Sequence, residues 1–242
     1  TQSSYAEYAL APAVRVWPAP AGFTLIESAA LPLQGLTALG CLRLSGRLQQ
    51  GDTVLVHAAA GGVGTLAIQL ARAVGSGRVI GTAGGAGKCA LVRSLGADDA
   101  IDYRTTEFAP LVRTQTDGRG ADVILDAVGK TTFEGDLACL ATYGRLVVFG
   151  AASGSPGEFV PNRLSGGCQT VTGFMLDTAL RHPSFQEAGP RELIQLCTVG
   201  TVKVQVGATF PLAEAAEAHR RMEQRDSTGT LVLIVDEDAA LG

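Results

Sequence analysis

Short apolar runs alternate with helical periodicity along the middle of the chain. Each run is nearly continuous in apolar residues, which is typical of strands covered on both faces by helices. The runs therefore predict five buried strands, at Thr53–His57, Arg78–Thr82, Ala100–Tyr103, Asp122–Asp126 and Arg145–Gly150.

Between these runs, apolar residues recur at the spacing of an amphipathic helix. Gly75 and Gly96 follow the first two helical stretches and are typical helix ends. Alternating strands and helices predict βαβ units with right-handed crossovers, and hence an α/β fold with a doubly wound parallel sheet of the Rossmann kind. The expected helices are Gly64–Val74, Lys88–Leu95, Phe108–Gln115 and Phe133–Leu140.

The two ends of the chain do not follow this rhythm. Residues 1–24 are rich in Ala and Pro, and near the other end a helix over Ala213–Glu223 precedes a strand over Thr230–Asp236. We interpret 25–206 as the Rossmann domain, and 1–24 and 207–242 as parts of a second, mainly β unit.

Composition excludes several classes of protein. The 242 residues are 46% hydrophobic and 17% charged, which argues against general disorder. No apolar run approaches the ~20 residues of a membrane span. A net charge of −4 without a Lys/Arg cluster argues against nucleic acid as the main partner. The start at Thr1 does not have the pattern of a signal peptide, so we expect a cytoplasmic protein that was processed or is part of a longer one.

The cysteines and histidines do not form a recognisable metal site. Five cysteines and three histidines are scattered singly, without a CxxC pair. Metal sites and disulfide frameworks need grouped ligands or regular spacings. We therefore expect no bound metal, and buried structural thiols in a reducing compartment.

A glycine-rich segment follows the first predicted strand and opens the first predicted helix. Against the G-x-G-x-x-G template it has Ala59 in the first glycine position. Gly61 would allow close approach to a pyrophosphate, and Gly64 would allow tight packing of helix on strand. The free N–H groups of the helix start favour phosphate. This predicts dinucleotide binding by Ala60, Gly61, Gly62, Val63 and Gly64, against the alternative of a tight turn without a ligand.

The end of the second predicted strand indicates which dinucleotide is bound. An NAD site usually has an acidic residue there for the ribose 2′-hydroxyl. This chain has no acid between Thr82 and Asp98, and Lys88 is placed to neutralise a 2′-phosphate. NADP(H) is therefore favoured over NAD, with a solvated Lys88 as the alternative.

These segments together resemble the medium-chain dehydrogenase/reductase superfamily, and in particular its zinc-independent, NADPH-dependent quinone oxidoreductase branch. Ser4–Tyr8 matches the strand near the end of that family's N-terminal catalytic domain. The further matching segments are Leu31–Ala38, Gly51–Val56, Ala59–Gly64, Leu95–Asp98, Asp126–Gly129, Gly144–Val147, Ala218–Met222 and Ser227–Gly229.

The resemblance implies roles for individual residues. Lys88 and Tyr103 match the pair that holds the 2′-phosphate, and Thr37 matches a phosphate-side contact. Residues after two strands match the nicotinamide side: Val128, Gly129, Phe149 and Gly150. For these residues the alternatives are a strand-end aromatic at Tyr103, a core residue at Phe149 and simple strand ends at the two glycines.

The chain departs from the family pattern at several places. Gly84 stands where many relatives have a Ser that helps bind the 2′-phosphate, and Thr230 where many have a Lys. Gln34–Gly35 stands near the position of a zinc ligand in zinc-dependent relatives, so the resemblance implies no zinc. Roughly the first hundred residues of the usual chain, most of the substrate domain, are missing.

The resemblance implies hydride transfer from NADPH to a small electron-poor acceptor such as a quinone or enone. A non-catalytic NADPH-binding module, used for dimerisation or redox sensing, and an NAD(P)-dependent alcohol dehydrogenase-like enzyme are the alternatives. No catalytic residue is assigned: His57 is expected to pack or to bond backbone, and His182 and His219 to be solvated. The family also implies a homodimer, formed near Val171–Phe174.

Overall fold

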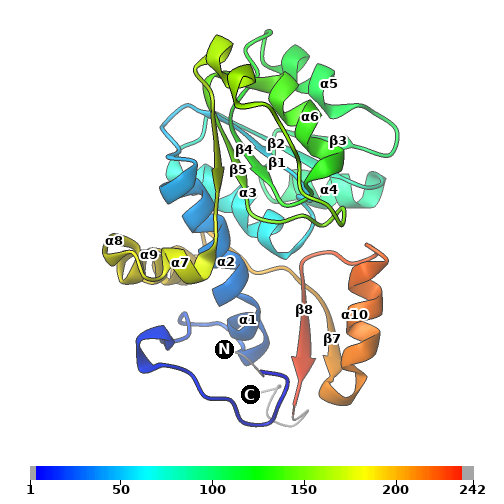
Figure 1. The fold of residues 1–242 in the computed structure, drawn as a ribbon. Coiled ribbons are helices and arrows are strands. Elements are labelled where there is room, and N and C mark those ends of the chain that lie inside the picture. The colour runs from blue at the N-terminus through cyan, green and yellow to red at the C-terminus, as the bar shows by residue number, and fades with distance from the viewer. Residues whose placement is uncertain (1–3, 236–242) are drawn as a thin grey trace.

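In the computed structural model, which describes residues 4–235, a six-stranded parallel sheet forms the centre of the molecule (Figure 1). Its strand order is β3-β2-β1-β4-β5-β6, so the chain runs outward in one direction and then returns to the middle to build the other half. This is the doubly wound Rossmann arrangement that the apolar runs predict. The strands are β1 (Thr53–Val56), β2 (Arg78–Ala83), β3 (Asp99–Asp102), β4 (Ala121–Asp126), β5 (Leu140–Val148) and β6 (Thr170–Gly173).

Helices cover both faces of this sheet. Along β1, Val54 and Val56 join one apolar cluster, while Leu55 between them joins a second cluster on the opposite face. The first cluster packs under α2 (Pro32–Gly40), α3 (Gly62–Val74), α4 (Ala86–Ser94) and α9 (Ala188–Thr198). The second packs under α5 (Phe108–Gln115) and α6 (Lys130–Cys139). Burial on both faces explains why the strands are apolar throughout.

The five predicted strands and the helices between them are present, with shifted ends. β5 begins at Leu140, where we expected a helix to end, and contains an irregular register against β4. β6 was not predicted as a strand. No elements were predicted for α1 (Leu25–Ala30), α2, the π-helical turn Cys41–Ser45, α7 (Leu176–Ala179), α8 (Pro183–Gln186) or α9.

A smaller βαβ unit lies beside the main sheet. β7 (Val206–Pro211) and β8 (Thr230–Ile234) form a parallel pair connected through a short 3₁₀ turn, Leu212–Glu214, and α10 (Ala215–Glu223) (Figure 1). The predicted strand reached Asp236, which lies outside the described residues.

The expectation of a strand at Ser4–Tyr8 is wrong. The chain bends there, and the first helical turn is Ala13–Arg15. A strand needs the backbone of a neighbour to satisfy its hydrogen bonds, and within residues 4–235 no strand pairs with this segment.

The cysteines divide into two groups. Cys41, Cys89, Cys139 and Cys197 are buried free thiols, as predicted, whereas Cys168 is exposed and was wrongly expected to be buried. Cys168 follows the 3₁₀ helix Pro161–Gly167 and has a left-handed backbone, which turns it away from the core. Across the described residues, no helix combines the length and apolarity needed to cross a membrane.

Candidate functional site

A cavity of about 760 Å³ opens at the carboxyl ends of β1, β2, β3 and β4. Its volume lies within the ~300–1,000 Å³ range of small-molecule sites. Ligands of open parallel sheets bind at this edge, where the strand order reverses. Six of the residues singled out in the sequence line the cavity: Ala60, Gly61, Thr82, Lys88, Tyr103 and Val128.

The other seven predicted site residues lie around the cavity without lining it. Gly62, Val63 and Gly64 form the first turn of α3, directly behind Gly61. Gly129 is buried next to Val128, with a φ of 90°. Thr37, on α2, and Phe149 and Gly150, after β5, are half-buried outside the lining.

The turn between β1 and α3 depends on Gly64. A Cβ atom at this position would lie 2.4 Å from the carbonyl oxygen of Ala58 and 2.6 Å from the Cα of Ala59. Both atoms are backbone and have little freedom to move, so only glycine fits. Gly61, at the N-cap position of α3, has no side chain to cap the helix. The first N–H groups of α3 are therefore available to an anion in the cavity.

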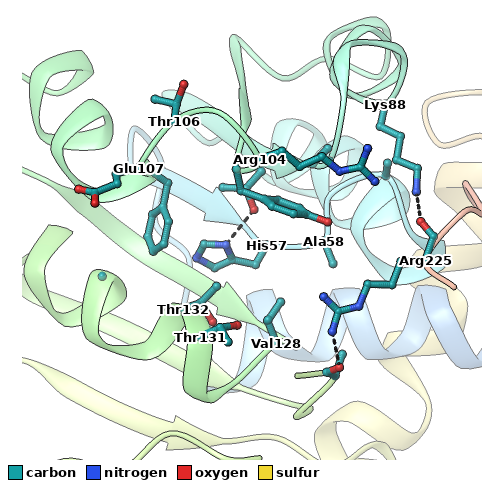
Figure 2. Close-up of a pocket in the computed structure, with 18 of the residues that line it drawn as sticks. His57, Ala58, Lys88, Arg104, Thr106, Glu107, Val128, Thr131, Thr132 and Arg225 are labelled. Atoms are coloured by element: carbon teal, nitrogen blue, oxygen red, sulfur yellow. Dashed lines mark hydrogen bonds between the residues drawn. The ribbon is translucent and has the colours of Figure 1, made fainter. Parts of the chain in front are cut away.

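Cationic side chains gather at one end of the cavity, which we call the cationic end (Lys88, Arg104 and Arg225) (Figure 2). Lys88 Nζ donates a hydrogen bond of 2.6 Å to the carbonyl oxygen of Arg225. Arg225 Nη2 donates a bond of 3.0 Å to the carbonyl oxygen of Ala152. These bonds draw α4, the loop after α10 and the loop after β5 together around one opening.

Gly84 gives Tyr103 and Arg104 their place at this end. A Cβ atom on Gly84 would lie 2.7 Å from Tyr103 Oη and 2.9 Å from Arg104 Nε. The departure from the family's Ser therefore leaves space that a phenol and a guanidinium occupy. Asp102, the acid nearest in sequence, accepts bonds of 3.0 Å from the backbone N–H groups of Gly85 and Arg104. It holds the loops in place and does not line the cavity.

Sequence reasoning missed Arg104 and Arg225. Arg104 is adjacent to Tyr103, so its position after β3 was a usable signal. Arg225 lies 137 residues from Lys88 along the chain. The sequence pattern contains no signal for that contact, because it depends on how the smaller βαβ unit packs against the sheet.

Partial burial lowers the pKa of Lys88. The negative charge of Asp226 opposes this effect, and the positive charge of Arg104 adds to it. Lys88 therefore releases its proton more readily than an ordinary lysine.

Another part of the cavity wall is formed by His57, Thr82 and Thr132 and is backed by Asp126 and Asp136, which do not line the cavity. We call this polar cluster the buried end (His57, Thr82, Asp126, Thr132 and Asp136). The His57 ring bonds two side chains. Its Nδ1 lies 2.9 Å from Thr82 Oγ1 (Figure 2), and its Nε2 lies 2.7 Å from Asp136 Oδ1. We expected His57 to pack or to bond backbone; the ring does pack, against Phe108, but its nitrogens bond side chains and not backbone.

Two further groups complete this end. The ring of Phe108 packs edge-on against His57 at 4.6 Å between centroids. Asp126, fully buried at the end of β4, accepts hydrogen bonds from Val128 N–H (2.7 Å), Gly129 N–H (3.2 Å) and Thr132 Oγ1 (3.0 Å). Asp126 thus shapes the loop that carries Val128 into the cavity.

The smaller βαβ unit closes against the phosphate turn. The N–H of Gly229 donates a bond of 2.7 Å to the carbonyl oxygen of Ala60, beside a bridge between Gly61 and Gly229. Thr230, the second departure from the family, is buried with Oγ1 2.9 Å from where a Cβ of Gly62 would lie. Thr230 therefore packs against the turn.

Comparison with known proteins places this architecture in a family. Residues 95–233, more than half of the chain, match the family model described as zinc-binding dehydrogenase. The chain is 40% identical over 216 residues to a quinone oxidoreductase of Pseudomonas aeruginosa, covering 89% of this chain and 66% of that protein. It is 35% identical over 235 residues to a 2-haloacrylate reductase of Burkholderia, and the match covers 96% of this chain and 70% of that protein.

Solved structures show the same similarity. A mycobacterial protein complexed with NADPH superimposes with a TM-score of 0.90 at 39% identity, covering 95% of this chain and 71% of that one. Escherichia coli quinone oxidoreductase complexed with NADPH superimposes with a TM-score of 0.83 at 34% identity, covering 89% of this chain and 67% of that one. The chain thus spans about two thirds of the length of these relatives. It belongs to the quinone oxidoreductase branch of the medium-chain dehydrogenase/reductase superfamily.

Proposed function

We propose that the chain binds NADPH and takes part in reducing a small electron-poor acceptor, such as a quinone or an enone, without zinc. The observation that carries the proposal is the cationic end of the cavity. Lys88, Arg104 and Arg225 surround the region beside Gly84, where an NAD site would present an acid. Three positive groups there favour a 2′-phosphate over a 2′-hydroxyl.

The residues present fit the cofactor along the cavity. The N-terminus of α3 faces the cavity without a capping side chain and suits a pyrophosphate. Val128 and the loop held by Asp126 lie at the carboxyl end of β4. NADPH would supply a hydride at its nicotinamide ring. The role of these residues is to bind and orient the dinucleotide and to exclude water, since the chemistry belongs to the cofactor.

The names of several relatives support this class of reaction. Quinone oxidoreductases of two bacteria and a 2-haloacrylate reductase are among them. Each name describes reduction of an electron-poor acceptor. We extend that class to this chain, with a soluble small molecule as substrate and the cytoplasm as its location.

A second candidate is a module that binds NADPH but does not turn over by itself. The chain spans 66% of the Pseudomonas quinone oxidoreductase, which favours this alternative. A third of that relative has no counterpart here, and a cleft needs both of its walls to orient an acceptor.

One experiment separates the two candidates. NADPH oxidation with a quinone acceptor is measured for the 242-residue chain and for the chain fused to the N-terminal part of a quinone oxidoreductase relative. Turnover in either protein, above that of a Lys88→Ala control, supports the enzyme. Binding of NADPH without turnover in both would establish the binding module instead.

We also propose that two copies pair through β6. β6 is the edge strand of the sheet, and its outer side pairs with no strand among residues 4–235. An unpaired edge offers backbone donors and acceptors to a second copy. Sedimentation equilibrium is expected to give the mass of a dimer, and a monomer at micromolar concentration would contradict this pairing.

A further inference from the structure

The buried end of the cavity contains more acceptors than donors if every acid in it is ionised. Asp126 and Asp136 have no exposed surface, and they lie close enough for each to affect the other. Asp136 Oδ1 faces His57 Nε2, whereas Asp136 Oδ2 is buried without any hydrogen-bond partner. A buried carboxylate oxygen without a donor costs considerable free energy.

The surroundings of Asp126 identify it as the anion of the pair. Two backbone N–H groups and the Thr132 hydroxyl donate hydrogen bonds to its carboxylate. Such a set of donors stabilises a negative charge. Asp136 has no comparable set, because its one polar contact at hydrogen-bond distance is with His57.

We propose that Asp136 is held as a neutral carboxylic acid whose Oδ2–H donates to Asp126, and that it acts as a positioning residue between two walls of the cavity. In this arrangement the Thr82 hydroxyl donates to His57 Nδ1, and His57 Nε2–H donates to Asp136 Oδ1. Every polar atom of the chain of contacts then has a partner. This series of hydrogen bonds links the ends of β1 and β2 to the loop after β4.

Groups from each neighbouring element are consistent with this assignment. Burial raises the pKa of Asp136, the cation of a charged His57 would oppose this, and the carboxylate of Asp126 adds to the increase. α5 contributes the apolar ring of Phe108. Burial raises the pKa of Cys139, on the same helix as Asp136, to about 12. No arginine or lysine makes an ion pair with this cluster among the described residues.

The arrangement has a consequence for stability against pH. The acid is neutral in the folded chain and ionised in the unfolded chain above its ordinary pKa of 3.8. Folding therefore takes up one proton, and stability falls as the pH rises towards the folded pKa. Between pH 7 and 9, ordinary histidines no longer titrate. Within that window, as far as the folded pKa of Asp136, the unfolding equilibrium constant is expected to rise about tenfold per pH unit more than in a chain without this proton.

Asp136→Asn is the matched variant, because its amide accepts from His57 and donates to Asp126 without a titrating proton. Urea unfolding of the 242-residue chain is measured from pH 7 to 9 for the wild type, Asp136→Asn and the exposed control Asp117→Asn. We expect the Asp136→Asn variant to lose the tenfold dependence and to become more stable than the wild type at pH 9, while the control keeps the wild-type profile. Parallel profiles for all three would overturn the proposal.

The position of the proton is read from His57 itself. His182 and His219 are exposed, so a His182→Gln, His219→Gln chain leaves one imidazole for long-range ¹H–¹⁵N spectra. A neutral ring protonated on Nε2 at pH 7 supports the neutral acid. An imidazolium signal would place the proton on His57 and overturn the assignment.

The positioning role is tested by rescue. Asp136→Ala is expected to weaken NADPH binding about tenfold or to prevent folding, and Asp136→Asn to restore both. An Ala variant that binds NADPH as the wild type does would overturn the positioning role. The unfolding and NMR measurements need no ligand, so their outcome is independent of whether the chain binds NADPH.

Discussion

The cationic end and the buried end of the cavity differ in the exposure and the bonding of their side chains. The cationic end uses long, partly exposed side chains that come from α4, the loop after β3 and the loop after α10 (Figure 2). The buried end uses side chains that, apart from the half-buried Thr132, have almost no exposed surface, and hydrogen bonds join them to one another and to backbone. Water screens charges at the first end, whereas at the second an unpaired charge is costly.

We infer from this difference that the cationic end recognises the nucleotide, whereas the buried end stabilises the fold around it. Cations at an open end can meet a phosphate of the cofactor and adjust to it. A fully bonded cluster at the other end fixes the ends of three strands before any ligand binds. Substitutions at the cationic end should therefore change which nucleotide binds, and substitutions at the buried end or at the turn between them should change stability first.

Gly64→Ala tests the turn that both ends share and has the largest expected effect. The new methyl group would meet backbone atoms of Ala58 and Ala59. We expect the free energy of unfolding to fall by about 3 kcal/mol, as for overpacking against a rigid neighbour. Urea unfolding followed by circular dichroism measures it. Gly87→Ala is the control, since its Cβ meets nothing within 4 Å; an equal loss at both glycines would contradict the account.

Lys88→Ala and Arg225→Ala test recognition at the cationic end. Each removes a charged donor from the expected position of the 2′-phosphate, so NADPH affinity should fall about tenfold while NADH affinity stays within about twofold. Calorimetric titration of both nucleotides measures the change. Lys203→Ala, at an exposed lysine outside the cavity, is the matched control. Equal losses for NADPH and NADH would show that these cations do not select the phosphate.

The pH dependence of NADPH binding tests the charge on Lys88. Its pKa is lowered by partial burial, so the ammonium is lost at a lower pH than in an ordinary lysine. NADPH affinity should therefore decrease as the pH rises from about 8 to about 10. Lys88→Arg, which stays charged, should remove most of this decrease. A wild-type profile that is flat over this range would argue against contact between Lys88 and the phosphate.

Gly84→Ser restores the residue of many relatives and has the smallest expected effect. A Cβ there would displace the ends of Tyr103 and Arg104, which are flexible. We expect NADPH binding to weaken roughly two- to threefold, because a neutral hydroxyl donor replaces a better-placed charged one. Tighter binding than in the wild type would show that Arg104 does not compensate for the missing Ser.

The local parts of the molecule could be predicted from the sequence. Apolar runs gave the strands up to β5, and the glycine turn and Lys88 pointed to the correct edge of the sheet. The missing pieces depend on distant contacts. The contact between Arg225 and Lys88 depends on how the smaller βαβ unit packs against the sheet. In the sequence Asp136 has the pattern of an exposed helix residue, and only the packing of α6 brings it to His57. Ser4–Tyr8 was expected to be a strand from resemblance, yet strand formation depends on a pairing partner.

Competitive titration of the unmodified chain with NADPH and NADH tests the central claim most directly. The three cations around Gly84 predict that NADPH binds at least about tenfold more tightly than NADH at neutral pH and low salt. Added salt is expected to reduce this ratio of affinities. Equal affinities for the two nucleotides would contradict the account.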